Sequence, residues 1–223
     1  MQLVPIRKWV ESNLSLRDFS KKILFLGDSN VFYVSHFVMF QAALLLPKIL
    51  VIDCAIRFQL NVLVELALQE SIMLEPFLEK IYIQRAFTPY QTVKAAKLAK
   101  NSSFPTVFFL APAKQILDPE VVPEESVFLL QKLYAEFATY PNLFIAEKQE
   151  YPNPVFKGTL SLLQKSVEEH WTLWKSKASI QRKIAAVLRN PEQAFSPSLR
   201  ITGNIGGRYG KNTPTLFKAH RKF

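Results

Sequence analysis

The sequence has little of the chemistry that cysteine and histidine provide. Cys54 is the single cysteine among 223 residues, so neither an internal disulfide nor a Cys-rich zinc site can form. The histidines, His36, His170 and His220, lie far apart and show no metal-ligand spacing. We therefore expect no metal. We also expect a reducing compartment, the cytoplasm or, in a eukaryote, the nucleus, in which Cys54 is a small buried apolar residue.

The sequence also lacks the features of secreted and membrane proteins. Residues 1–10 contain no continuous apolar run, so we expect no signal peptide. The segment Val31–Pro47 carries no formal charge, but it includes three polar side chains and is short for a bilayer span. We interpret it as a buried helix that Pro47 ends, with His36 as a core histidine, and we expect no membrane contact.

Acidic residues are nearly missing from the C-terminal part of the chain. Residues 1–174 contain 17 Lys and Arg and 17 Asp and Glu, so their charges cancel. Residues 175–223 contain 11 Lys and Arg and one acid, Glu192, so they carry the whole formal net charge of +10. A neutral body with a basic end predicts a polyanionic partner, nucleic acid first. A solvated basic tail that aids solubility is the alternative.

Apolar residues are abundant, at 49% of the chain with 18 Phe, and they are grouped in alternating short and long segments. Strands alternating with helices predict βαβ units, and hence an α/β fold with a mostly parallel sheet and helices on both faces. The expected strands are Lys22–Leu26, Ile49–Asp53, Ile81–Ile83, Pro105–Leu110 and Asn142–Ala146. The expected helices are Phe32–Leu46, Arg57–Glu70, Glu75–Lys80, Pro89–Lys100 and Glu124–Thr139.

The pattern changes after Tyr151–Pro154. We expect a helix at Gly158–Glu169 and an edge strand at His170–Trp174. A basic helix at Ser179–Leu188 and a hairpin or basic arm at Leu199–Phe223 follow. We therefore divide the chain into a core domain, residues 1–174, and a basic C-terminal extension, residues 175–223.

The turn after the first long strand occupies the place where ligands bind in open α/β sheets. A phosphate-binding loop needs several glycines, a Lys and a Ser or Thr, but this turn offers only Gly27 and Ser29. The strand Pro105–Leu110, which would supply a magnesium-binding acid, leads into Ala111. We therefore expect no ATP hydrolysis and no cofactor.

The residues Gly27-Asp28-Ser29 resemble the first block of the GDSL (SGNH) esterases, in which the Ser is the nucleophile. That family also has an Asp-x-x-His and a Gly-x-Asn-Asp segment. Here Val167 precedes His170, and Phe217 precedes His220, at the spacing where the Asp should stand. An esterase that uses Ser29 remains an alternative hypothesis that lacks its base and orienting acid.

A longer stretch resembles the RecA/RadA-like recombinases. Val51–Phe58 is similar to their strand ending in Ile-Asp-Thr-Glu-type residues, and Arg85–Gln91 is similar to their Arg-Ala-x-x-x-x-Gln helix start. The resemblance covers Lys22–Ala146 and implies a RecA-like core. It departs from the family at Ala111 and at the phosphate loop. It therefore implies a vestigial nucleotide site without catalytic residues, formed by Gly27, Asp28, Ser29, Asn30 and Asp53.

The first functional hypothesis combines this resemblance with the charge pattern: a non-catalytic RecA/RadA-like protein that binds DNA or a recombination or repair partner. Cations of the extension would neutralise phosphates, and Tyr209 and Phe217 would stack on bases. The expected DNA-binding residues are Arg200, Arg208, Tyr209, Lys211, Phe217, Lys218, Arg221 and Lys222. An alternative is a structural subunit that self-associates through RecA-like edges. Two interpretations stay open for Arg57, Arg85 and Gln91: they bind a phosphate or a partner, or they cap helices.

Overall fold

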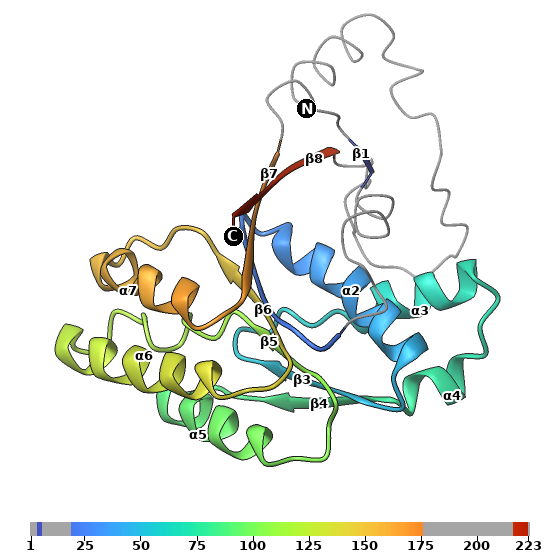
Figure 1. The fold of residues 1–223 in the computed structure, drawn as a ribbon, viewed down its shortest axis with the longest axis horizontal. Helices are drawn as coiled ribbons and strands as arrows, with labels where there is room; N and C mark the ends of the chain where they lie inside the picture. Colours follow the sequence, from blue (N-terminus) through green and yellow to red (C-terminus); the bar gives the residue numbers. More distant parts are fainter. Residues whose placement is uncertain (1–3, 6–18, 176–215, 223) are drawn as a thin grey trace, which may run out of the picture.

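A single sheet organises the computed structural model, which describes residues 4–5, 19–175 and 216–222 (Figure 1). Its strand order is β1-β8-β7-β2-β6-β5-β3-β4. The six strands from β7 to β4 are parallel, and β8 pairs antiparallel with β7. The strands are β1 Val4–Pro5, β2 Lys22–Gly27, β3 Ile49–Asp53, β4 Ile81–Arg85, β5 Val107–Leu110, β6 Leu143–Lys148, β7 Glu169–Lys175 and β8 Leu216–Lys222.

Helices cover both faces of the sheet (Figure 1). Successive strand residues point to opposite faces, so β2 sends Ile23 and Phe25 into one core and Leu24 and Leu26 into the other. The first core contains α2, α3 and α4, and the second contains α5, α6 and α7. The helices are α2 Val31–Leu45, α3 Leu60–Gln69, α4 Leu74–Leu78, α5 Pro89–Lys100, α6 Pro123–Ala138 and α7 Pro154–Lys165.

Strands buried on both faces explain the continuous apolar runs of the sequence. Every residue of β3 and β5 is buried, as expected for the middle of a parallel sheet. Counted along the parallel strands alone, the order is 3-2-4-5-1-6, which differs from the 3-2-1-4-5-6 order of dinucleotide-binding folds. The chain therefore has a parallel α/β fold of the broad Rossmann-like and P-loop-like kind.

The expected strand at His170–Trp174 is confirmed, but its expected position at the edge of the sheet is wrong. This segment forms β7, which pairs with β2 on one side and with β8 on the other. Of the expected basic extension, residues 175–223, the structure describes Lys175 at the end of β7 and the strand β8, which lies in this same sheet; the expected helix at Ser179–Leu188 lies outside the described residues. At the opposite end of the sheet, β4 is an edge strand that pairs only with β3 among the described strands.

Helix boundaries differ from the sequence expectation where side chains bind nearby backbone. The helix α7 begins at Pro154 rather than Gly158, because Asn153 accepts a hydrogen bond from the Val155 N–H at 2.9 Å and caps the first turn. The helix α2, 15 residues long, is apolar nearly all round and packs into the core. Among the described helices, none has the length and apolarity that a bilayer crossing requires.

Candidate functional site

The turn at the carboxyl end of β2 begins with a glycine that the sheet itself requires. A Cβ atom on Gly27 would lie 2.5 Å from the backbone oxygen of Leu173 in β7. Real Cβ atoms do not approach a backbone oxygen so closely, and this oxygen belongs to a strand that is paired on both sides. Gly27 therefore permits the contact between β2 and β7, which accounts for it without a ligand.

The next three residues close this turn with their own groups. Asp28 Oδ1 accepts hydrogen bonds from the Asn30 backbone N–H at 2.8 Å and from the Asn30 side-chain amide at 2.6 Å. The Val31 N–H donates to the Asp28 carbonyl at 3.0 Å. Anion-binding nests need a left-handed residue, and no residue from 27 to 30 has a positive φ. The geometry is that of an Asx turn rather than a phosphate cradle.

Ser29 is exposed in this turn, and two of the three histidines are unsuited to activate it. His36 is buried; its Nδ1 bonds the Phe32 carbonyl at 2.5 Å and its Nε2 accepts from the Gln59 N–H at 2.8 Å. Burial lowers the pKa of His36, so the ring is neutral, and its interpretation as a satisfied core histidine is confirmed. His170 lies opposite Leu24, on the order of 15 Å along the strand from Ser29.

Asp53, at the carboxyl end of β3, shapes the following loop. Its buried carboxylate accepts hydrogen bonds from the backbone N–H groups of Ala55, Arg57 and Phe58 at 3.2, 2.8 and 3.1 Å. Ile56 between them has a φ of 53°, so the loop resembles an anion nest that the carboxylate fills. This loop, rather than the expected first helical turn, is why α3 begins at Leu60 and not at Arg57.

Arg57 lies at the same edge of the sheet as the turn after β2. Its guanidinium carbon is 5.3 Å from the centre of the Phe32 ring, in the first turn of α2. Its Nε is buried and has no hydrogen-bond partner in the described structure. Its charge also acts on Tyr151, in the loop after β6, whose pKa it lowers against the larger effect of burial. Arg57 thus packs against α2, and its charge acts on the loop after β6.

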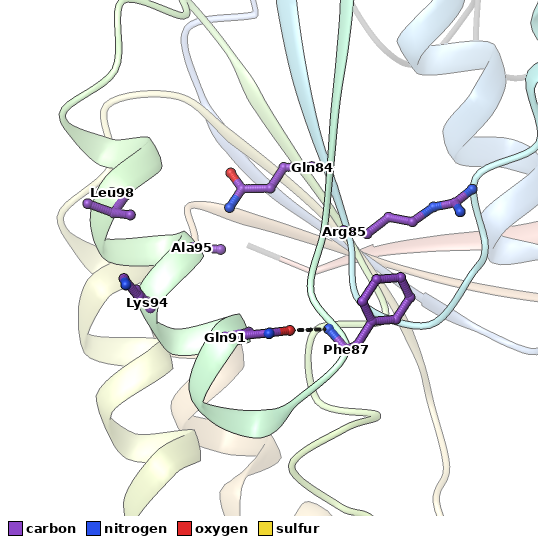
Figure 2. Close-up of a pocket in the computed structure, with 7 residues that line it drawn as sticks. All are labelled: Gln84, Arg85, Phe87, Gln91, Lys94, Ala95 and Leu98. Carbon is purple, nitrogen blue, oxygen red and sulfur yellow. Dashed lines mark hydrogen bonds between the residues drawn. The ribbon is translucent and has the colours of Figure 1, made fainter.

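The Arg85–Gln91 segment forms the end of β4 and the start of α5. Thr88 is the N-cap, as expected: its hydroxyl accepts from the Gln91 N–H at 3.2 Å, and Pro89 follows at the first helical position. Gln91 Oε1 accepts from the Phe87 N–H at 2.8 Å, as Figure 2 shows. The glutamine therefore holds the chain at the helix start, with a bond to the residue before the N-cap rather than to the N-cap itself as in a capping box.

A shallow pocket of about 380 Å³ lies between β4 and α5. Figure 2 shows Gln84 pointing toward α5 and Arg85 pointing away from it, as alternation along a strand requires. The pocket opens beside an apolar sheet edge, because Tyr82 and Ile83 of β4 are 50% and 45% exposed and Phe87 is 55% exposed. The residues that line the pocket are Gln84, Arg85, Phe87, Gln91, Lys94, Ala95 and Leu98.

Glu147, at the carboxyl end of β6, is a residue that sequence reasoning missed. It is completely buried and accepts hydrogen bonds from the N–H groups of Ala113 and Lys148, both at 2.8 Å, and from the Tyr151 hydroxyl at 2.6 Å. Burial raises its pKa to about 7, although these hydrogen bonds and the Lys148 charge favour the ionised form. The available signal was an acid directly after the apolar run Leu143–Ala146.

The position of Glu147 in the sheet is that of a binding or catalytic group. The chain leaves β2 toward α2 on one face and leaves the neighbouring β6 toward α7 on the other. Ligands of open α/β sheets bind at such switch points, outside the carboxyl ends of the strands. Perturbed pKa values also cluster at functional sites.

Three further polar side chains surround Glu147, and together these four residues form what we call the Glu147 cluster: Glu147, Tyr151, Tyr134 and Cys54. The Tyr134 hydroxyl on α6 is buried without a hydrogen bond of good geometry in the described structure, although the Thr159 hydroxyl lies close to it. Burial raises the pKa of Cys54 to about 12, so this thiol is unreactive, and its interpretation as a buried residue is confirmed.

The expected DNA-binding residues fall into two groups. Arg200, Arg208, Tyr209 and Lys211 lie outside the described residues. Phe217, Lys218, Arg221 and Lys222 belong to β8, where Lys218 pairs with Trp174 and Lys222 with His170 across the antiparallel ladder. His220 also lies in β8, opposite Thr172.

Comparison with known proteins adds no family to these observations. No protein-family model matches the chain, and no curated protein has a recognisably similar sequence. Within residues 19–175, no group of three or more His, Cys, Asp or Glu side chains is arranged to hold a metal ion. The functional argument therefore rests on the fold, the carboxyl edge of the sheet and the charge of the sequence.

Proposed function

We propose that the chain is a non-catalytic RecA/RadA-like protein that binds DNA in recombination or repair, through cations of residues 175–223. The observation that carries this proposal is the charge distribution. Residues 175–223 hold 11 Lys and Arg against one acid, whereas residues 1–174 are neutral overall. A basic segment attached to a neutral body attracts phosphates strongly at one place, while the neutral body does not bind polyanions non-specifically.

The arrangement of the core supports the RecA-like part of the proposal. The first long strand, β2, lies inside a parallel sheet and leads through a tight turn into α2, which is the place of a phosphate loop in P-loop proteins. The Arg85–Gln91 segment spans a strand end and a helix start, as the resemblance implies. Ala111, with a φ of 50°, occupies the end of β5 where the family has its acid.

The geometry of the strand ends supports the non-catalytic part. Gly27 contacts the backbone of β7, Asp28 closes its own turn, and Asp53 is saturated by three backbone N–H groups. The glycine and the two acids that a nucleotide site would use at this edge are thus engaged in holding the fold. Ser29 has no base in His36 or His170.

The DNA-binding proposal is tested by fluorescence anisotropy with labelled single-stranded and duplex oligonucleotides at low salt. The key variant combines Arg200→Gln, Arg208→Gln and Lys211→Gln, which spares the residues of β8. The matched control combines Lys94→Gln, Lys97→Gln and Lys157→Gln, which removes equal charge from exposed positions on α5 and α7. We expect the key variant to bind at least about tenfold more weakly and the control to bind like the wild type. Equal weakening by both variants would mean that only net charge matters.

The exposed edge of the sheet favours a second candidate function, a structural subunit that self-associates. The edge strand β4 leaves its outer hydrogen-bonding groups unpaired among the described strands, and Tyr82 and Ile83 are largely exposed on it. Natural proteins usually protect such edges with charges or prolines, and β4 has one charge, Arg85 at its end. An apolar, unprotected edge suits pairing with another strand.

Light scattering at increasing protein concentration tests this second function. The variant Ile83→Lys places a charge in the middle of the edge, and Leu68→Lys, at a position 60% exposed on α3, is the control. We expect the wild type and the control to form oligomers and the Ile83 variant to stay monomeric. A wild-type protein that is monomeric at every concentration rules this function out.

A further inference from the structure

The Glu147 carboxylate connects two loops at the carboxyl edge of the sheet. Its Oε2 accepts from Ala113, in the segment between β5 and α6, at 2.8 Å. Its Oε1 accepts from Lys148 and Tyr151, at the end of β6 and in the segment before α7, at 2.8 and 2.6 Å. Ala113 and Glu147 are 34 residues apart in the chain, so this side chain joins segments that the backbone does not connect directly.

The donors of these three bonds leave only one way for Glu147 to carry a proton. An ionised carboxylate accepts at both oxygens, whereas a carboxylic acid must donate once. Backbone N–H groups cannot accept, so Ala113 and Lys148 cannot receive that proton. The Tyr151 hydroxyl can both donate and accept, and it lies 2.6 Å from Oε1. A protonated Glu147 would therefore donate to Tyr151, and the Tyr151 proton would turn toward another acceptor.

The candidate for that acceptor is the hydroxyl of Tyr134. The Tyr134 hydroxyl on α6 is buried without a well-formed hydrogen bond in the described structure, and its charge state influences the pKa of Tyr151. Three charged groups act on the cluster. The Lys148 charge acts on Glu147, the Asp53 charge acts on Cys54, and the Arg57 charge acts on Tyr151. Of the charged groups, only Lys148 acts directly to keep Glu147 ionised.

We propose that Glu147 is a protonation switch at the carboxyl edge of the sheet. Ionised, it holds the loop after β5 and the loop after β6 together through charge-assisted hydrogen bonds. When it takes a proton from solvent, its hydrogen bond with Tyr151 reverses and its hold on Ala113 weakens. The loop after β6 borders the switch point between β2 and β6, so the edge at which a ligand or partner would bind changes with protonation.

The physiological range is where this switch operates. Burial raises the pKa of Glu147 from 4.5 to about 7, so the folded protein takes up the proton more readily than the unfolded chain. The group's contribution to stability is fully present below about pH 4.5 and is lost as pH rises through about 7. Burial thus disfavours the ionised, loop-holding state, so that the two protonation states are balanced near neutral pH.

The first test is a ¹³C NMR titration of the side-chain carboxyl carbons in the full-length protein, with E147Q used to assign the Glu147 signal. We expect this signal to titrate with a midpoint near pH 7, and Tyr151→Phe to raise the midpoint because a bond to the ionised form is lost. The control variant is Glu136→Gln, which removes a carboxylate of α6 that pairs with Lys100 at 3.1 Å. A midpoint below about 5.5 for the Glu147 signal of the wild type overturns the proposal; if E147Q does not fold, the signal is assigned by its shift in Tyr151→Phe.

The second test follows the loop itself by amide hydrogen exchange. The Ala111 N–H bonds a backbone oxygen, that of Ala146, and the Ala113 N–H bonds Glu147, both at 2.8 Å. The protection factor of Ala113 divided by that of Ala111 should fall at least about threefold as pH drops from 8 to 6 in the wild type. It should be constant in E147Q. A ratio that stays constant in the wild type shows that Glu147 does not control the loop, and overturns the proposal.

Discussion

Single residues at the strand ends have structural roles that cannot be predicted from their residue types alone. Gly27 is required because β7 passes too close for any Cβ, and Asp53 is required because its carboxylate replaces an anion within a loop. Both residues occupy positions where nucleotide-binding proteins with open α/β sheets use a glycine or an acid for their ligand. The same residue types therefore have an internal role here.

The Gly27 account predicts a loss of stability in Gly27→Ala. The new Cβ would meet the Leu173 oxygen at 2.5 Å, and a central strand cannot move away without breaking its pairing. We expect the free energy of unfolding to fall by about 1–3 kcal/mol in a urea titration. The control is Gly158→Ala in α7, which meets nothing within 4 Å and should gain about 0.5–1 kcal/mol. Equal effects of the two substitutions would contradict this account.

The buried His36 predicts a pH dependence of opposite sign to that of Glu147. Burial lowers the pKa of His36, so its contribution to stability is present above about pH 6.5, the unfolded value, and is lost as pH falls below it. We expect the free energy of unfolding of the wild type, relative to His36→Gln, to decrease between about pH 6.5 and pH 5. Urea titrations at several pH values measure this difference. A relative stability that is flat with pH would mean that folding does not shift the pKa of His36, and would contradict this account.

At the level of elements, local sequence patterns predicted most strands and helices, but they did not predict which strands pair with each other in the sheet. The strand Ile49–Asp53 and the capped start of α5 at Thr88 follow from apolar runs and cap residues, and both are confirmed. The place of β7 could not be predicted, because it depends on pairing with β2 and β8. Glu147 was missed for the same reason, since the Ala113 donor that makes it central is distant in sequence.

The start of α5 gives a prediction at this scale. The Thr88 hydroxyl accepts from the Gln91 N–H, so Thr88→Ala leaves one helix donor unsatisfied. We expect a loss of about 1 kcal/mol in the free energy of unfolding, measured by urea titration. Thr88→Ser keeps the hydroxyl and should lose only a few tenths of that amount. If both variants lose the same, the methyl packing of Thr88 rather than its cap is responsible.

At the scale of the whole molecule, the net charge is concentrated in one part of the chain. The fold needs residues 19–175 for its six parallel strands and six helices, and residues 1–174 have no net charge. The excess of +10 belongs to residues 175–223, of which β8 joins the sheet beside β7. Composition made this asymmetry predictable from the sequence, whereas the pairing of β8 with the core was not.

The most direct test of the account is the salt dependence of DNA binding. Each phosphate that a cation neutralises on duplex DNA makes the slope of log K against log salt steeper by about 0.9. We predict that the combined Arg200→Gln, Arg208→Gln and Lys211→Gln variant has a slope about 2–3 shallower than the wild type. The Lys94, Lys97 and Lys157 control should keep the wild-type slope. No binding by the wild type at low salt, or the same slope in all three proteins, would contradict the proposal that residues 175–223 bind DNA.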